Sequence, residues 1–203
     1  ATIDLAGHTL RGNDSGSVIT VYSGGSLTLQ DNSDSGKVTG GAIPEDANQS
    51  SWMLGAAVTV NGGTFTMNGG TITDNDASHC GGVVNVSSGR FTMEGGSISN
   101  NTGTGLSVGG SGSSATIGSG AAISGNTVTT DGASCGGVHV LDGGSVTLNG
   151  GTISNNTVPE NGGGVFINSG TFTMNSGSIT GNTAGTDGNG WGGGVYIMNG
   201  TFD

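Results

Sequence analysis

Residues that can act as acids, bases or nucleophiles are sparse in this sequence. The 203 residues include 14 Asp and Glu, three Lys and Arg, and three His. Hydrolysis of a glycosidic bond needs two carboxylates about 5 to 9.5 Å apart, but Glu94 and Asp142 have no acidic counterpart in the neighbouring repeats described below. Arg11, Lys37 and Arg90 likewise share no position in neighbouring repeats. We therefore expect no catalytic residues and no enzymatic activity.

Metal binding has one candidate segment. Asp74 and Asp76 offer the hard oxygen ligands that calcium prefers. The chain has neither an EF-hand loop nor the Gly-Gly-x-Gly-x-Asp repeat of calcium-binding solenoids. Its histidines, His8, His79 and His139, fall at different positions of the repeat. We therefore expect no cofactor, and keep calcium as the alternative.

Composition excludes several classes of protein. A formal net charge of −11 leaves little to neutralise phosphates, so nucleic acid is excluded as a partner. No apolar run approaches the roughly 20 residues that cross a bilayer, so no membrane insertion is expected. Glycine accounts for 46 residues, and each costs a helix interior about 1 kcal/mol relative to alanine. Regular β structure remains.

A repeat of three short apolar segments organises the chain. Residues 84–102 and 165–183 match position by position in residue class. In the first of these, apolar residues two apart form two segments, at 84–86 and 91–93, and Ile98 marks the third. Such alternation points the apolar side chains to one face of a strand.

The same apolar pattern in every repeat predicts that the chain winds into a coil. If each repeat makes one turn, equivalent strands stack about 4.8 Å apart into three parallel sheets around a narrow apolar interior. Residues 1–203 are thus predicted to form a single all-β domain, a parallel β-helix of about seven coils with three short strands each. We expect a monomer that is a piece of a longer protein, truncated at both ends. Glycine pairs such as Gly69-Gly70, Gly95-Gly96 and Gly150-Gly151 are expected at the corners, with positive φ.

One asparagine recurs three residues after the apolar residue of each third segment. Stacked amides at such a position can hydrogen-bond along the column, and we predict an asparagine ladder there. The alternative is that these side chains bind a ligand. The ladder residues are Asn75, Asn101, Asn126, Asn156 and Asn182.

The repeat motifs resemble those of a known group of proteins. The glycine-rich segments 40–43, 162–165 and 192–195 and the Phe-x-x-Asn segments 65–68 and 172–175 are similar to repeats of bacterial surface right-handed parallel β-helices. These include adhesin-like repeat proteins and autotransporter passengers of the polymorphic outer-membrane type. The resemblance implies a right-handed coil and an extracellular location on the bacterial cell surface, but it is weak for function because the fold also carries enzymes and inert stalks.

The connections from each ladder asparagine to the next first strand vary in length. They span 9, 5, 12, 9 and 13 residues along the chain, and both tryptophans, Trp52 and Trp191, fall at this edge. Inserted loops on one face of a solenoid are where binding sites usually lie. The alternative is that acidic residues keep the coil soluble and the tryptophans merely cover its edge.

Cys80 and Cys135 occupy similar places in two of the long connections. Their coils are two rungs or about 9.6 Å apart, whereas a disulfide needs Cα atoms within about 7 Å. The short connection from Asn101 to Leu106 lies between them, and the longer loops could close over it. An extracellular setting permits a disulfide; two separate thiols are the alternative.

An aromatic column is predicted on the first strands of the last three coils. The middle residue of that strand is polar or small in the early coils but becomes His139, Phe166 and Tyr196, with Trp191 just before Tyr196. We expect these rings to be exposed, about 4.8 Å apart, and to bind a host glycan or protein. The alternative is that they only stiffen the sheet.

The second strands present a further column, of threonines. Paired threonine columns of this kind resemble ice-binding solenoids, although threonine is also a common exposed strand residue and Arg90 interrupts the array. The residues are Thr28, Thr66, Thr92, Thr116, Thr147 and Thr173. The function expected is therefore a non-catalytic surface adhesin or stalk; the alternatives are part of a carbohydrate-processing β-helix with its catalytic coils elsewhere, and an ice-binding solenoid.

Overall fold

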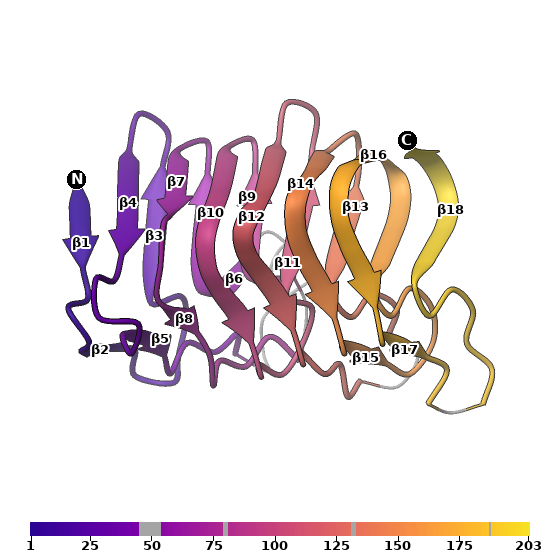
Figure 1. Cartoon of the computed structure of the whole chain (residues 1–203), viewed down its shortest axis with the longest axis horizontal. Coiled ribbons are helices and arrows are strands. Elements are labelled where there is room, and N and C mark those ends of the chain that lie inside the picture. The colour runs from indigo at the N-terminus through magenta and orange to yellow at the C-terminus, as the bar shows by residue number, and fades with distance from the viewer. Residues whose placement is uncertain (45–53, 79–80, 131–132, 187) are drawn as a thin grey trace.

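The computed structural model describes residues 1–44, 54–78, 81–130, 133–186 and 188–203, and its regular structure in these ranges is all β (Figure 1). The strands are β1 (Thr2–Asp4), β2 (Thr9–Arg11), β3 (Ile19–Tyr22), β4 (Ser26–Gln30), β5 (Lys37–Thr39), β6 (Gly55–Asn61), β7 (Thr64–Met67), β8 (Thr71–Ile72), β9 (Gly82–Ser87), β10 (Arg90–Ser99), β11 (Leu106–Gly109), β12 (Ser114–Ser124), β13 (Val138–Leu141), β14 (Ser145–Ser154), β15 (Thr157–Val158), β16 (Val165–Thr180), β17 (Thr183–Ala184) and β18 (Val195–Phe202). Within these ranges no helix is long and apolar enough to span a membrane.

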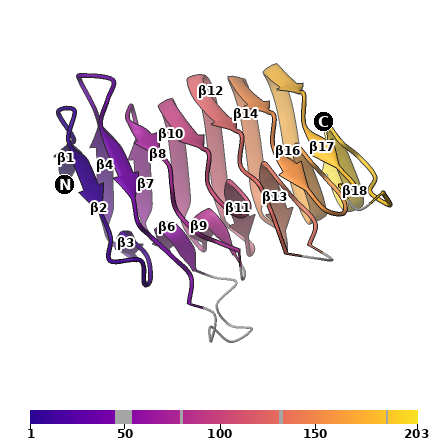
Figure 2. The same ribbon diagram turned by 90° about the horizontal axis from the view of Figure 1, so that it is seen from below.

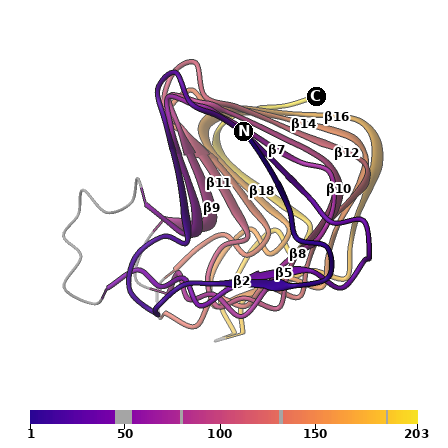
Figure 3. The ribbon, with the colours of Figure 1, turned by 90° about the vertical axis from the view of Figure 1, so that its left-hand side faces the viewer.

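The strands wind into a parallel β-helix of about seven coils, as the repeat predicts. The first sheet contains β3, β6, β9, β11, β13 and the starts of β16 and β18. The second contains β1, β4, β7, the starts of β10, β12 and β14, the middle of β16 and the end of β18. The third contains β2, β5, β8 and the ends of β10, β12, β14 and β16. Seen from the N-terminal end, the chain runs clockwise around a three-sided interior as it recedes, so the coil is right-handed (Figure 3).

The register keeps every apolar position in phase from coil to coil. Val58 pairs with Val84 in the first sheet, and Phe65 with Phe91 in the second. Because side chains alternate along a strand, this register turns all apolar residues to the inside. The predicted inward face is therefore confirmed.

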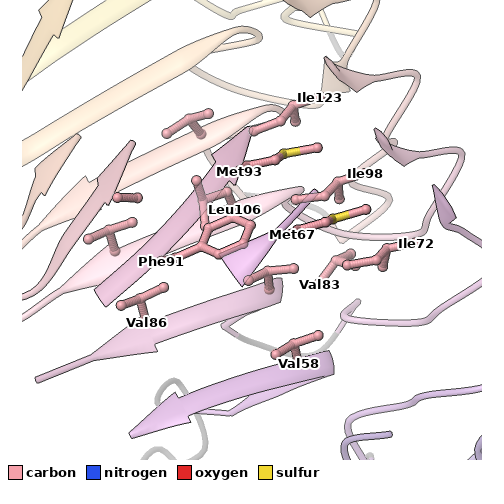
Figure 4. Close-up of a cluster of buried hydrophobic side chains, with 14 of the residues drawn as sticks. Val58, Met67, Ile72, Val83, Val86, Phe91, Met93, Ile98, Leu106 and Ile123 are labelled. Carbon is pink, nitrogen blue, oxygen red and sulfur yellow. The ribbon is translucent and has the colours of Figure 1, made fainter. Parts of the chain in front are cut away.

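The core is a stack of aliphatic and aromatic side chains along the coil axis. Ile72, Ile98 and Ile123 lie in one column of the third sheet and are fully buried, with Met67 and Met93 beside them (Figure 4). Burying a side chain of this size contributes about 1.5 to 3 kcal/mol. The rings of Phe65 and Phe91 stack with centroids 5.4 Å apart, as do those of Phe172 and Phe202.

The corner between the second and third sheets differs from the expected break between strands. In β10, β12, β14 and β16 the strand continues through the corner at a shift in register, as Figure 2 shows for these neighbouring strands. Glycine makes the bend possible: Gly96 has a φ of 83°, and a Cβ there would lie 2.5 Å from the carbonyl oxygen of Gly70. A bulge of this kind bends the chain while most ladder hydrogen bonds are kept. The predicted positive φ is also found at Gly70 and Gly150.

The asparagine ladder forms at the turn after the third sheet. Asn126 is completely buried, and its Nδ2 donates to Oδ1 of Asn156 and to the carbonyl oxygen of Ile98, each at 3.0 Å. Its own Oδ1 accepts from the backbone N and Nδ2 of Asn101, at 3.2 and 2.9 Å. The same pattern joins Asn75 to Asn101 and Asn156 to Asn182. The amides therefore satisfy the backbone at a turn where the sheets leave it unpaired.

A short fourth ladder follows the asparagines, which the apolar pattern does not indicate. Residues one position after each ladder asparagine form parallel bridges from coil to coil. The residue one position before adopts left-handed backbone with φ between 55° and 70°, which explains why Gly, Asp or Asn stands there in every coil. These residues are Asp74, Asn100, Gly125, Asn155 and Gly181, and Gly40 has the same conformation before Gly41 in the first coil.

Candidate functional site

The outer face of the first sheet is covered for most of its length by the chain's own connections. The middle residues of its strands, Thr59, Asn85 and Ser107, are each only 3% exposed. A Cβ on Gly81, in the connection before β9, would lie 3.4 Å from Nδ2 of Asn85. An outward side chain of this sheet is therefore not exposed in these three coils.

The aromatic column lies on this covered face. Its stacking is confirmed: the His139 and Phe166 rings have centroids 5.1 Å apart, and those of Phe166 and Tyr196 are 5.4 Å apart. The expected exposure is wrong for Phe166, which is 7% exposed, and His139 and Tyr196 are half-buried. Glycine-rich connections approach the rings closely, since a Cβ at Gly162 would lie 2.7 Å from that of Phe166. Whether the column binds a ligand stays a prediction.

His139 carries an unusual polar atom. Its Nε2 is buried and has no hydrogen-bond partner among the residues that the structure describes. Burial lowers the pKa of the imidazole to about 4, because the charged form would lose its hydration. The ring is therefore neutral at physiological pH. A buried nitrogen without a partner is uncommon in folded proteins and is a feature to be explained.

Of the four residues predicted to bind a ligand, Trp191 is the one whose side chain is largely exposed. Its side chain is 67% exposed on the connection before β18. Its backbone is fixed, since Trp191 N donates to Oδ1 of Asn161 at 2.9 Å and Gly162 N donates to the Trp191 carbonyl oxygen at 3.0 Å. The ring is thus presented from an anchored backbone. Trp52 lies outside the described residues.

The two long connections around the short one meet above it. Oγ1 of Thr130 donates to the carbonyl oxygen of Ser78 at 2.6 Å, and Oγ1 of Thr104, in the short connection, donates to the carbonyl oxygen of Cys135 at 2.7 Å. The expectation that these loops close over the short connection is confirmed. Cys135 is fully buried, and burial raises the pKa of its thiol. Cys80 lies outside the described residues, so the disulfide stays a prediction.

A hollow of about 210 Å³ remains between these loops. Ala77, Ser78 and Gly81 line it from one side and residues 103–104 from the short connection, with His139 reaching it from β13. On the other side its described lining is Val128, Thr130, Ala133 and Ser134. It exists because the short connection leaves a gap that the two long ones flank. The sequence shows the difference in length between these connections. The hollow could not be predicted from it, because the hollow depends on the path that each loop takes.

A second hollow of about 190 Å³ lies at the corner between the second and third sheets. Asp31 and Asp34 line it, but the Asp31 carboxylate already accepts hydrogen bonds from the backbone N of Gly36 and Gly7, each 2.7 Å, and from Oγ of Ser33. These bonds, that from Gly36 first, lower the pKa of Asp31. Asp31 therefore acts as a clamp that closes the turn after β4, a role that the apolar pattern does not indicate.

The other sequence candidates lie apart. Glu94 lies in β10 where the register shifts between Met93 and Gly95, and Asp142 follows β13 in the first sheet. In the described ranges no three His, Cys, Asp or Glu side chains gather as a metal site would need. One carboxylate oxygen of Asp76 accepts from Ser78 N. Calcium binding stays untested.

The threonine column is real as a column. The register places Thr66 beside Thr92 and Thr116 beside Thr147 on the second sheet, all half-buried, with Arg90 exposed next to them. This face is regular and uncovered. Ice binding stays untested.

Comparisons of the chain with protein-family models, with curated proteins and with solved structures found no match. The likeness to bacterial surface β-helices therefore stays a resemblance of motifs and fold.

Proposed function

We propose that this chain is a non-catalytic binding segment of an extracellular bacterial surface protein, which holds a host glycan or protein at the edge formed by its connections. The observation that carries this proposal is the asymmetry of the coil. The second and third sheets repeat regularly, whereas the connections over the first sheet differ in length and path from coil to coil. Variation confined to one edge of a rigid scaffold is the usual arrangement of a binding surface.

The chemistry of this edge favours contact over catalysis. Trp191 is exposed on an anchored backbone, and Tyr196, five residues later in the sequence, is half-buried. Aromatic rings of this kind give a large contact area at little conformational cost. Since the described carboxylates are dispersed over the coil, we do not assign one as a general acid or base.

The net charge limits the classes of partner that the chain can bind. With a net charge of −11 the chain repels nucleic acid and other polyanions. A neutral glycan or a protein surface avoids this repulsion. The resemblance to bacterial surface β-helices supports an extracellular location, and a monomer suffices to present the edge.

A screen of immobilised glycans and host proteins tests the proposal. We expect Trp191→Ala to weaken binding of the ligands found by at least thirtyfold, about 2 kcal/mol, as for a central interface aromatic. Tyr22→Ala is the matched control, because Tyr22 is also an exposed aromatic, at 66%, but lies in an early coil. Both variants should keep the melting temperature of the wild type, since exposed side chains change stability by about 0.5 kcal/mol or less. Equal binding by wild type and Trp191→Ala would contradict the proposal.

A further inference from the structure

The hollow between the long connections is a built feature. Two hydrogen bonds, from Thr130 to Ser78 and from Thr104 to the backbone of Cys135, tie its surrounding loops to each other and to the short connection. Its described walls carry hydroxyl groups from Ser78, Thr104, Thr130 and Ser134 beside apolar side chains. Both threonine hydroxyls spend their hydrogens on backbone carbonyls, so their lone pairs remain as acceptors.

His139 adds a further unsatisfied group. The ring lines the hollow, is held by its stack on Phe166, and leaves Nε2 buried without a partner in the described part of the chain. A neutral imidazole nitrogen can accept a hydrogen bond in one tautomer and donate it in the other. A ligand hydroxyl serves either case, because it is both donor and acceptor. The site thus lacks the partner that a hydroxyl-bearing molecule would supply.

Charge and size limit the ligand further. The described lining contains no charged side chain, so none of these residues would compensate the lost hydration of a bound ion. The chain's net charge of −11 adds repulsion for anions. A volume of about 210 Å³ is below the roughly 300 Å³ at which pockets begin to hold drug-sized molecules. One ring fits such a space, and an extended oligosaccharide does not.

We propose that this hollow binds a single neutral sugar ring, with a ligand hydroxyl hydrogen-bonded to Nε2 of His139 and apolar ring edges against Ala77, Val128 and Ala133. The inference rests on the proposed binding function and adds a second site to it, separate from Trp191. It assigns the hollow to a terminal or free monosaccharide. It also gives the stacked His139 a role in recognition besides packing.

Saturation-transfer NMR with a panel of neutral hexoses and N-acetylhexosamines, set against glucuronate and glucosamine, tests this site. We expect the wild type to bind a neutral sugar and neither charged one. His139→Phe keeps a ring on Phe166 but removes Nε2, and should weaken that binding about tenfold, the value of one hydrogen bond. His8→Phe is the matched control, at an exposed histidine of the first coil, and should bind like the wild type. Ala133→Leu fills the hollow and should abolish binding without touching His139.

Three results would overturn the inference: no neutral monosaccharide binds, charged sugars bind equally well, or His139→Phe binds as the wild type does. If His139→Phe fails to fold, Ala133→Leu tests the site instead. Retained sugar binding by Ala133→Leu would show that the hollow is not the binding site. The two proposals fail separately. Monosaccharide binding without any Trp191-dependent attachment supports the hollow and removes the surface at Trp191, and the reverse result removes only the hollow.

Discussion

Ile98→Asp should lower the unfolding free energy by about 4 kcal/mol or more. Ile98 is fully buried between Ile72 and Ile123 in the third sheet. A carboxylate there would have neither water nor a partner, and a buried charge without compensation is among the few causes of so large a loss. Urea unfolding followed by circular dichroism at neutral pH measures the change.

The control for this variant is Ser99→Asp, one residue beyond Ile98 on the same strand. Ser99 faces outward and is half-buried, so its replacement should change stability by about 0.5 kcal/mol. A large loss in Ser99→Asp and a small one in Ile98→Asp would mean that the inward face is assigned to the wrong residues.

Asn126→Ala should cost about 3 to 5 kcal/mol, although it removes no hydrophobic side chain. The side chain of Asn126 makes four hydrogen bonds in a fully buried position. Its loss leaves buried groups of Asn101, Asn156 and Ile98 short of partners, and each unsatisfied group costs about 1 to 3 kcal/mol. The same urea titration should show a lower midpoint with an unchanged slope.

Asn175→Ala is the control that shows whether burial, and not asparagine stacking alone, gives the ladder its effect on stability. Nδ2 of Asn175 donates to Oδ1 of Asn149 at 2.8 Å, but this pair is exposed to water. Its removal should cost at most about 1 kcal/mol, because water replaces the lost partner. Comparable losses in the two variants would contradict the role assigned to burial in the ladder.

The periodic parts of the molecule could be predicted from the sequence for a physical reason. Each coil repeats the same pattern of apolar residues, so the side of the strand that faces the interior can be checked at the equivalent position of every other coil. Val84, Phe91 and Ile98 occupy the interior because every neighbouring coil has an apolar residue in register. The left-handed position before each ladder asparagine was not predicted, although Asp74, Asn100 and the glycines that stand there are residues that tolerate it.

The covered face could not be predicted in this way because the connections do not repeat. Alternation says only that Phe166 points away from the interior, and an outward side chain is usually exposed. Whether a connection folds over it depends on contacts particular to that coil, such as Gly162 against Phe166. One signal was present: three consecutive glycines before β16 and again before β18 allow backbone to lie directly on an aromatic ring.

The small polar residues on the same face carried a related signal. Asn85 and Ser107 stand where later coils have rings, and both are almost fully buried. Residues of this size leave room for a connection to pack against the strand. The hollow at His139 follows from one short connection between two long ones, which sequence lengths indicate only when the loop paths are known.

The most direct test of the central claim, that the connections form the binding edge, is to shorten one of them. Residues 183–194 would be replaced by Thr-Gly-Thr-Gly, the sequence of residues 102–105 that closes the coil before β11. Binding of this variant to ligands from the glycan and protein screen is then measured by surface plasmon resonance. We expect this variant to fold but no longer to bind the ligands found in the screen. Unchanged binding by the shortened chain, with loss of binding in a Thr147→Lys and Thr173→Lys variant of the second sheet, would contradict it.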